Sequence, residues 1–562
     1  MNDGKQLVLN TQFTENIDAL VAKKIEENAP GCIVAVVHNG EVIFKKGYGY
    51  ANLDHMVPIT DDTSFYIASV SKQFTAMSVL LLAEAGQVDL DKSIRAYLKD
   101  LPENTEAVTV RHLIHHTGGL RSYINLIKMK GFFNNLVFDN LSMDDIYSLL
   151  LRQKDVVSLP GEKYQYSNTG YILLVRLIEH ISGKSFAEFT QEHIFSPLGM
   201  ETALFIQNPS RIIPNYAQGY KKSDDGFDIF STRSSLAGST GMVCTVKDMV
   251  KWDRYLSEGG LGIGKWNLAE VIREPGNLSD GSPLEYSYGL QVNEYKGRKT
   301  IYHGGSLFGS DSFYLKFIDD DLSVIIFSNL EIFGCNNLAY AIADVIFDPP
   351  SDDEQQTQTV EEPKSAFEEI EFVTCDTDGI VGIYRSRKSK SALIIESEDE
   401  RISLNLLGFP GEPHKYSAIA ENDFILSERG KSTLLPPKRV KFVDEEGSIR
   451  VDIYYGEEVT TVYDFLRPIQ DDSIVPSDVP GVYYSHELDT FYRVTLNKHK
   501  LLLRNDISEL SCFQITKNEF TYGEAVFEVQ RNETGEVTGL IFYSGPSDAK
   551  GLEISKIKCD IS

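Results

Sequence analysis

A serine and a lysine three residues apart mark a part of the chain that could perform acyl transfer. In Ser69-Val70-Ser71-Lys72 this spacing places the hydroxyl and the amine one turn apart on the same face of a helix. The start of a helix also favours negative charge, such as the charge that develops on a carbonyl oxygen under attack. The S-x-x-K pattern alone is a weak signal, because serine is also a favoured residue at helix starts. The pair therefore needs further groups before it indicates a nucleophile.

A tyrosine and an asparagine in Tyr166-Ser167-Asn168 are candidates for those groups. They precede a helix that the apolar pattern predicts from 169 to 180, so a phenol and an amide at its head could reach Ser69. A serine becomes a nucleophile only when a base accepts its proton, and Lys72 and Tyr166 are both candidate bases. A buried Lys72 could lose its proton near neutral pH, or as a cation it could lower the pKa of Tyr166. The sequence leaves this choice open.

A glycine-rich strand end supplies a third element, His303-Gly304-Gly305-Ser306. Glycines let a strand edge approach a ligand without side chains in the way, and the edge can then donate backbone N–H groups. The structural alternative is a bulge at the glycines, with a histidine that only ends the strand. We expect the strand edge to face Ser69.

The elements that must position these residues mix helices and strands. A helix predicted from 71 to 85 is apolar on nearly every side and ends at Gly86, so it belongs inside a core. Residues 32–37 and 42–44 predict a hairpin, and 313–315 and 322–327 predict neighbouring strands joined by an acidic turn. We expect the first and last of these strands to share one antiparallel sheet, which gives an α+β domain over 1–347.

The rest of the chain has a different texture. Residues 348–370 are polar, acidic and proline-marked, which predicts a linker. Short alternating strands follow, and the similar openings at 380–384 and 479–483 indicate an internal repeat. We therefore predict two related antiparallel β-barrels, over 371–470 and 471–562.

The composition excludes several classes of function. A net charge of −28 without a Lys/Arg-rich run disfavours nucleic-acid and membrane-surface partners. The six cysteines lie far apart, and His115 and His116 have no acidic partner at ligand spacing, so we expect no metal and a structural role for both histidines. The N-terminal residues have no apolar leader, which favours a cytoplasmic protein.

Together the three motifs resemble those of the serine β-lactamase and penicillin-binding-protein superfamily. The segments 115–120 (HHTGGL), 160–162 (PGE) and 197–200 (PLGM) resemble recurring turns of its class C-like branch. Within that branch the chain is most similar to the bacterial D-aminopeptidases, in the nucleophile segment 69–75 and in 481–489. The resemblance implies a β-lactamase/transpeptidase-like catalytic domain followed by two lipocalin-like barrels.

The resemblance also implies roles for the motif residues. Ser69 would be the nucleophile, completed by Lys72, Tyr166 and His303, with no cofactor. The oxyanion would be held by the N–H groups of Ser69 and Ser306. Substrate contacts would come from Asn168, Gly304, Gly305 and Ser306. Many relatives have a lysine in place of His303, and a largely neutral histidine implies weaker recognition of substrate carboxylates.

The expected function is a serine hydrolase acting on a small molecule or short peptide, with removal of N-terminal D-amino acids as the leading hypothesis. The alternatives are a carboxylesterase of the same fold, a penicillin-binding, D,D-peptidase or β-lactamase-like activity, and a ligand-binding sensor without turnover. One departure bears on this choice. In the D-aminopeptidases a loop of the last barrel reaches the cleft, whereas 519–527 here predict strands joined by a tight turn. A homodimer is also left open.

Overall fold

The computed structural model describes the chain as two compact units, Met1–Ile124 with Phe133–Thr357 and Asn125–Phe132 with Gln358–Ser562. The residues it describes are 11–130, 138–223, 225–347, 381–386, 392–398, 401–406, 414–420, 423–428, 439–445, 448–454, 461–467, 478–497, 500–505, 509–516, 518–522, 525–543 and 551–557. The linker predicted at 348–370 lies outside them.

A six-stranded antiparallel sheet forms the centre of the first unit. Its strands run in the order β10 (Gln291–Tyr295), β11 (Arg298–Ser306), β12 (Asp311–Phe317), β13 (Leu322–Ser328), β1 (Cys32–His38) and β2 (Glu41–Tyr48). The pairing of β1 with β13 joins the two ends of this unit, because Cys32 lies opposite Ser328 and His38 opposite Leu322. The predicted hairpin, the two neighbouring strands and their shared sheet are all confirmed.

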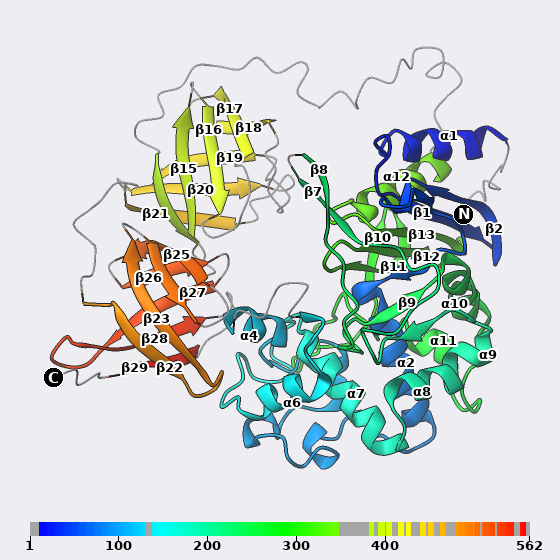
Figure 1. Cartoon of the computed structure of the whole chain (residues 1–562), viewed down its shortest axis with the longest axis horizontal. Helices are drawn as coiled ribbons and strands as arrows, with labels where there is room; N and C mark the ends of the chain where they lie inside the picture. Colours follow the sequence, from blue (N-terminus) through cyan, green and yellow to red (C-terminus); the bar gives the residue numbers. More distant parts are fainter. Residues whose placement is uncertain are drawn as a thin grey trace. The chain divides into compact units, whose positions relative to one another are not determined.

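Apolar helices cover one face of this sheet. α1 (Thr11–Ala22) and α12 (Cys335–Phe347) lie against each other and against the sheet (Figure 1). Ile17 and Ile342 are fully buried there with Val34, Leu315 and Ile326, one residue from each of three strands. Each Å² of apolar surface that these side chains remove from water contributes about 25 cal/mol, so this layer stabilises the sheet.

A buried ion pair lies on the other face, where α10 (Val246–Glu258) packs on β13 and β1. Asp253 of α10 accepts from Lys316 Nζ at 3.3 Å, and each side chain is only 2% exposed. The same carboxylate accepts from Tyr314 at 2.7 Å and from Ser323 at 2.6 Å. These hydrogen bonds satisfy charges that would otherwise be costly to bury.

The helical part of the first unit surrounds α2 (Lys72–Glu84), which packs on α7 (Asn168–Ser182). Nearly all residues of α2 are buried, as its all-round apolar pattern predicted. The structure refines its start, because a 3₁₀ turn over Ala68–Ser71 precedes the α-helix, so Ser69 lies just before it. The other elements of this part are β3 (Tyr50–Asn52), β4 (Val57–Pro58), β5 (Phe65–Tyr66), 3₁₀ turns at Ile94–Ala96 and Glu103–Thr105, α3 (Val110–Ile114), α6 (Met143–Leu151), α8 (Phe186–Thr190), a π-helical turn at Gln191–Phe195, α9 (Ser196–Leu198), β6 (Leu204–Phe205), β7 (Tyr220–Ser223), β8 (Gly226–Ile229), β9 (Met242–Cys244) and α11 (Leu268–Val271). The helix α4 (Tyr123–Met129) begins in this unit, and its residues from Asn125 onward belong to the second.

The second unit contains two closed barrels in which each strand pairs with the next along the chain. The first runs from β14 (Gly382–Ser386) to β21 (Thr461–Arg467), and the second from β22 (Gly481–Ser485) to β29 (Leu552–Lys556). The inner strands of the first barrel are β15 (Ala392–Glu398), β16 (Arg401–Leu406), β17 (His414–Ala420), β18 (Asp423–Glu428), β19 (Arg439–Glu445) and β20 (Ser448–Tyr454). Those of the second barrel are β23 (Thr490–Asn497), β24 (Lys500–Arg504), β25 (Glu509–Thr516), β26 (Glu519–Tyr522), β27 (Ala525–Arg531) and β28 (Val537–Tyr543). This unit also holds the segment 125–132, where the Tyr492 hydroxyl donates to the Met129 carbonyl at 2.8 Å.

Among the described residues, no helix has both the length and the apolar character needed to cross a membrane.

Replacing Asp253 by alanine tests the buried ion pair. The change leaves the Tyr314 and Ser323 hydroxyls without this acceptor, while Lys316 keeps Asp321 at 2.6 Å, so it should lower the free energy of unfolding by about 1–3 kcal/mol for each hydroxyl left unpaired. Glu26→Ala, which removes the exposed partner of Lys222, should cost only about 0–1 kcal/mol. Urea denaturation measures both, and equal losses would show that the buried pair has no special weight.

Candidate active site

The hydroxyl of Ser69 lies against the amine of Lys72. Lys72 Nζ is 3.0 Å from Ser69 Oγ, as expected for residues one turn apart at the start of α2. Ser69 is partly exposed, whereas Lys72 is fully buried. The oxygen can therefore be reached from solvent while the amine beside it is enclosed.

A strained residue precedes this serine. Ala68 has φ of +44°, in the left-handed region that side-chain-bearing residues rarely adopt. Neighbouring hydrogen bonds hold it there, because Ser71 Oγ donates to the Ala68 carbonyl at 2.7 Å and Ser312 Oγ of β12 donates to the Ile67 carbonyl at 2.8 Å. Nothing in the sequence indicated this strain, since alanine has no preference for such a conformation.

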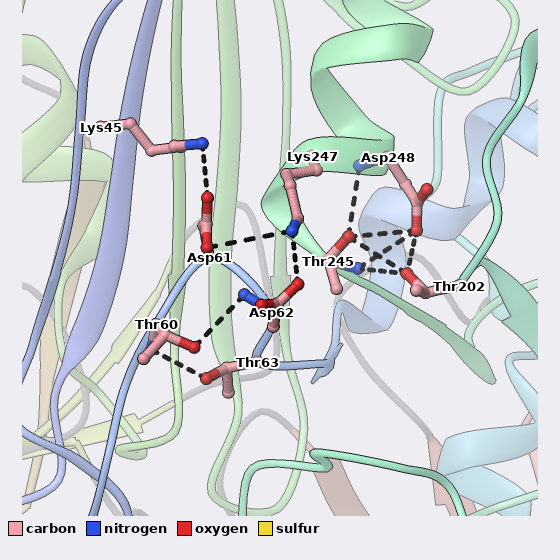
Figure 2. Close-up of polar contacts among 9 residues, drawn as sticks. All are labelled: Lys45, Thr60, Asp61, Asp62, Thr63, Thr202, Thr245, Lys247 and Asp248. Carbon is pink, nitrogen blue, oxygen red and sulfur yellow. Dashed lines mark hydrogen bonds and ion pairs between the residues drawn. The ribbon is translucent and has the colours of Figure 1, made fainter.

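Ion pairs fix the loop that leads to β5 and the nucleophile (Figure 2). Asp61 lies 2.6 Å from Lys45 of β2 and 3.9 Å from Lys247 of α10, and Asp62 also pairs with Lys247. Thr245 caps α10 by accepting from the Asp248 N–H at 3.3 Å. These exposed pairs contribute little energy each, but together they connect the loop to a strand and a helix.

The second motif reaches the same serine from α7. Ser167 is the N-cap of this helix and Asn168 its first residue, so both motif side chains lie at the helix head. Asn168 Oδ1 accepts from Lys72 Nζ at 2.8 Å, and the Ser69 hydroxyl lies close enough to the Tyr166 phenol to lower its pKa slightly against the larger effect of burial. The centre of the Tyr166 ring is 4.9 Å from Lys72 Nζ. The structure thus brings Ser69, Lys72, Tyr166 and Asn168 together.

A backbone carbonyl that the sequence did not indicate completes the surroundings of Lys72. The carbonyl of Ser239 accepts from Lys72 Nζ at 2.7 Å, and the Ser239 hydroxyl contacts Tyr123 at 3.2 Å. Any residue carries a carbonyl, so no pattern could have predicted this contact.

Burial controls the protonation of the amine. It lowers the pKa of Lys72 well below the ordinary lysine value, because the charged form loses its hydration. The three hydrogen-bond partners of Nζ are uncharged oxygens. A neutral amine can donate to the two carbonyl oxygens and still offer its lone pair to the Ser69 hydroxyl. The geometry therefore suits Lys72 as the proton acceptor of Ser69.

Tyr166 keeps its proton in the same surroundings. Burial of the phenol raises the pKa of Tyr166 above its ordinary value, which outweighs the opposite effect of the nearby Ser69 hydroxyl. The residue still exposes 37% of its surface, so the site opens to solvent at this tyrosine.

His303 is enclosed behind these rings. Its Nδ1 lies 2.6 Å from the Gly304 carbonyl, which can only accept, so Nδ1 carries the hydrogen. Nε2 is then left to accept from the Tyr286 hydroxyl at 3.2 Å. Burial, together with the nearby Lys72, lowers the pKa of His303 to about 3. Both ring nitrogens are engaged within the protein and the residue is only 2% exposed, so a catalytic role for His303 stays a prediction.

The glycines of the third motif have separate roles. A Cβ at Gly305 would lie 2.4 Å from the Ile67 carbonyl oxygen and 2.8 Å from the Ser69 nitrogen, so only glycine lets β11 approach the nucleophile's backbone. A Cβ at Gly304 would meet the Phe313 ring at 3.3 Å and the Ser312 carbonyl oxygen at 3.9 Å, so it has more room. The pairing of β10 with β11 ends at Tyr302, and Ser306 at the end of β11 is exposed.

Comparisons with known proteins find similar sequences. The model of the beta-lactamase family matches residues 13–344. A D-aminopeptidase of Gluconobacter oxydans is 30% identical over 360 residues, which cover 62% of this chain and 66% of that protein. A D-aminopeptidase of Brucella ovis is 32% identical over 308 residues, covering 54% and 57%. The chain thus matches at most 66% of the length of these relatives.

Solved structures share the fold. An octameric penicillin-binding protein homologue from Pyrococcus abyssi superposes with a TM-score of 0.55 at 22% identity, over 80% of this chain and 99% of that one. A D-amino acid amidase from Ochrobactrum anthropi SV3, solved with D-phenylalanine, gives a TM-score of 0.52 at 24% identity, over 60% and 99%.

Gly305→Ala tests the close approach of β11. The added Cβ would push the strand away from the Ser69 backbone, so the reaction of Ser69 with a fluorophosphonate should slow by on the order of 10²-fold, as for a displacement of about 1 Å. Gly304→Ala, where the added Cβ has more room, should slow it far less. Mass spectrometry of the labelled protein gives both rates, and equal rates for the two variants would contradict this assignment.

Proposed function

The chain belongs to the beta-lactamase family, and from this premise we propose that it is a serine hydrolase that forms an acyl-enzyme on Ser69 and cleaves small amide or peptide substrates. Removal of N-terminal D-amino acids is the reaction that the D-aminopeptidase relatives favour. The observation that carries the proposal is the enclosed Lys72 amine, 3.0 Å from the Ser69 oxygen.

Lys72 acts as the general base in this proposal. Its lone pair takes the Ser69 proton while the oxygen attacks the substrate carbonyl carbon, and the N–H groups of Ser69 and Ser306 hold the resulting oxyanion. The proton then passes to the leaving amine, with the Tyr166 hydroxyl as the proposed relay because its ring lies 4.9 Å from Lys72 Nζ and its phenol is near Ser69. Water hydrolyses the ester by the reverse transfers, which regenerate Ser69 and the neutral amine.

The arrangement of Asn168 supports a role in holding substrate amides. Its carbonyl oxygen accepts from Lys72, and within the described part of the chain its NH₂ group has no acceptor. That group can donate to a carbonyl of the substrate. Asn168 would therefore orient the substrate through the side of its amide that Lys72 does not use.

The enclosed, neutral His303 argues for substrates without a carboxylate beside the scissile bond. A lysine at this position would supply a fixed cation, whereas His303 has a pKa of about 3 and exposes only 2% of its surface. Aminopeptidase, amidase or esterase activity is thus favoured over penicillin or D,D-peptidase chemistry. The intact set of Ser69, Lys72 and Tyr166 weighs against a sensor without turnover.

A carboxylesterase of the same fold is the second candidate. β26 and β27 pair from Glu519↔Glu528 to Tyr522↔Ala525, so only two residues join them. This leaves no long loop there of the kind that restricts the substrate's amino end in the D-aminopeptidases. Bulkier esters would then be accepted as well. We also propose that the barrels are lipocalin-like, because each consists of eight antiparallel strands in sequential order.

Ser69→Ala should lower turnover of D-alanine p-nitroanilide by on the order of 10⁶-fold, because no other group can form the acyl-enzyme. Ser78→Ala is the matched control, since Ser78 is a buried serine of the same helix that donates only to the Phe74 carbonyl at 2.7 Å. Wild-type turnover by the Ser69 variant would end the mechanism.

A substrate panel separates the candidate functions. Faster turnover of D-alanine p-nitroanilide than of its L-isomer supports the aminopeptidase, and turnover of p-nitrophenyl acetate alone supports the esterase. Nitrocefin hydrolysis should be slow, because the neutral His303 supplies no fixed cation to bind its carboxylate. Rapid nitrocefin hydrolysis would refute that part of the proposal.

The pH dependence of kcat/KM should report Lys72. Since burial lowers the pKa of Lys72, the amine is neutral well below the ordinary lysine value of about 10.4, and kcat/KM should fall only when the pH drops through that lowered pKa. Lys72→Arg, which stays protonated, should remove the activity across the range. An acid limb near the ordinary lysine value would show that the amine is charged at neutral pH.

A further inference from the structure

The segment that carries Tyr166 has no regular structure of its own. Residues 164–167 belong to neither helix nor strand, and α7 begins only at Asn168. Two of its backbone N–H groups, one on either side of Tyr166, nevertheless donate hydrogen bonds that hold the segment. The His116 carbonyl accepts from the Gln165 N–H at 2.8 Å, and His116 Nδ1 accepts from the Ser167 N–H at 3.2 Å. One residue therefore holds both neighbours of the tyrosine.

The His116 ring also packs against the tyrosine itself. Its centre is 4.3 Å from that of the Tyr166 ring, with an angle of 40° between the planes. Tyr286 and Tyr171 support it from other sides, at 4.7 Å and 5.2 Å between ring centres. His116 is only 2% exposed, so the phenol ring rests on an enclosed imidazole.

Two energetically unfavourable features occur together in this histidine. Its φ of +57° lies in the left-handed region, and that conformation accompanies its two contacts with the 165–167 segment. Because Nδ1 accepts a hydrogen bond, Nε2 carries the hydrogen, and among the described residues this buried nitrogen has no hydrogen-bond partner. Strain and an unsatisfied buried donor in one residue are features of functional sites.

The imidazole has to remain neutral for this arrangement. Burial, with Lys72 and His303 nearby, lowers the pKa of His116 well below its ordinary value, so Nδ1 stays an acceptor for the Ser167 N–H. Protonation would turn Nδ1 into a donor facing another donor. His116, which the sequence assigned to a structural turn, therefore stays neutral and contacts Tyr166 and Ser167 of the second motif as well as Gln165 before it.

We infer that His116 is a positioning residue for the reaction, which holds Tyr166 and the head of α7 in register with Ser69 and Lys72. The inference rests on the proposed function. His116 touches no reacting atom in this account. It acts through Tyr166 by ring packing, and through the Ser167 N–H that directly precedes Asn168.

Two variants separate these contacts. His116→Asn keeps a side-chain acceptor and tolerates the left-handed backbone, but it removes the ring. It should lower kcat by on the order of 10-fold to 10²-fold with little change in KM, as expected for a displaced proton relay. It should also move the acid limb of kcat/KM to higher pH, because water that replaces the ring stabilises the Lys72 ammonium. His116→Phe keeps the ring and loses the acceptor, so kcat should fall while the acid limb stays in place.

His112→Asn is the matched control. Its Nδ1 accepts from the Thr109 N–H at 3.2 Å, the same distance as in the His116 contact, but it caps α3 away from the second motif. This variant should lose stability on thermal unfolding without a change in kcat or in the pH profile. A loss of kcat equal to that of His116→Asn would attribute the effect to stability and overturn the inference.

A double-mutant cycle with Tyr166→Phe tests whether His116 acts through the tyrosine. In the Tyr166→Phe background, His116→Asn should reduce kcat much less than in the wild type, because the group that it positions is already missing. Full additivity of the two losses, or unchanged kcat in both folded His116 variants, would overturn the inference. The proposed function fails separately, if the wild-type protein neither turns over the substrate panel nor reacts with a fluorophosphonate at Ser69.

Discussion

The burial of one amine is the constraint on which the site depends. Lys72 lies at the start of an almost wholly buried helix, and its Nζ meets three uncharged oxygens. Withholding water and charge partners from an ammonium favours the neutral form, which is the form that can accept a proton from serine. The elements around α2 can therefore be understood by how they enclose this nitrogen while leaving Ser69 accessible.

The sheet and its connections place the nucleophile against that amine. Ser312 of β12 holds the Ile67 carbonyl, Ala68 adopts a strained conformation, and the glycine at 305 lets β11 come within contact of the Ser69 backbone. The loop before β5 is joined to β2 and α10 by ion pairs (Figure 2). A hydroxyl fixed from several directions needs little rearrangement when it attacks, and such preorganisation is the main contribution a protein makes to catalysis of this kind.

Short sequence patterns predicted those features of the site that depend on residues close together in the chain. The S-x-x-K spacing, the amide at the head of α7 and the hairpin of β1 and β2 all follow from periodicity and turn residues, and the structure has them where they were expected. The positive φ of Ala68, the Ser239 carbonyl and the Tyr286 partner of His303 left no such pattern, because they arise from contacts between distant segments. The enclosure of His303 likewise depends on residues that the motif does not contain, and its catalytic role stays a prediction.

A direct titration of Lys72 tests whether its amine is uncharged in the folded protein. The protein would be labelled with ¹³C at the lysine ε-carbons and followed by NMR over pH, with Lys72→Met identifying the signal that disappears. This signal should titrate well below those of the other lysines. A Lys72 signal that titrates with the others, near the ordinary value of about 10.4, would contradict the account.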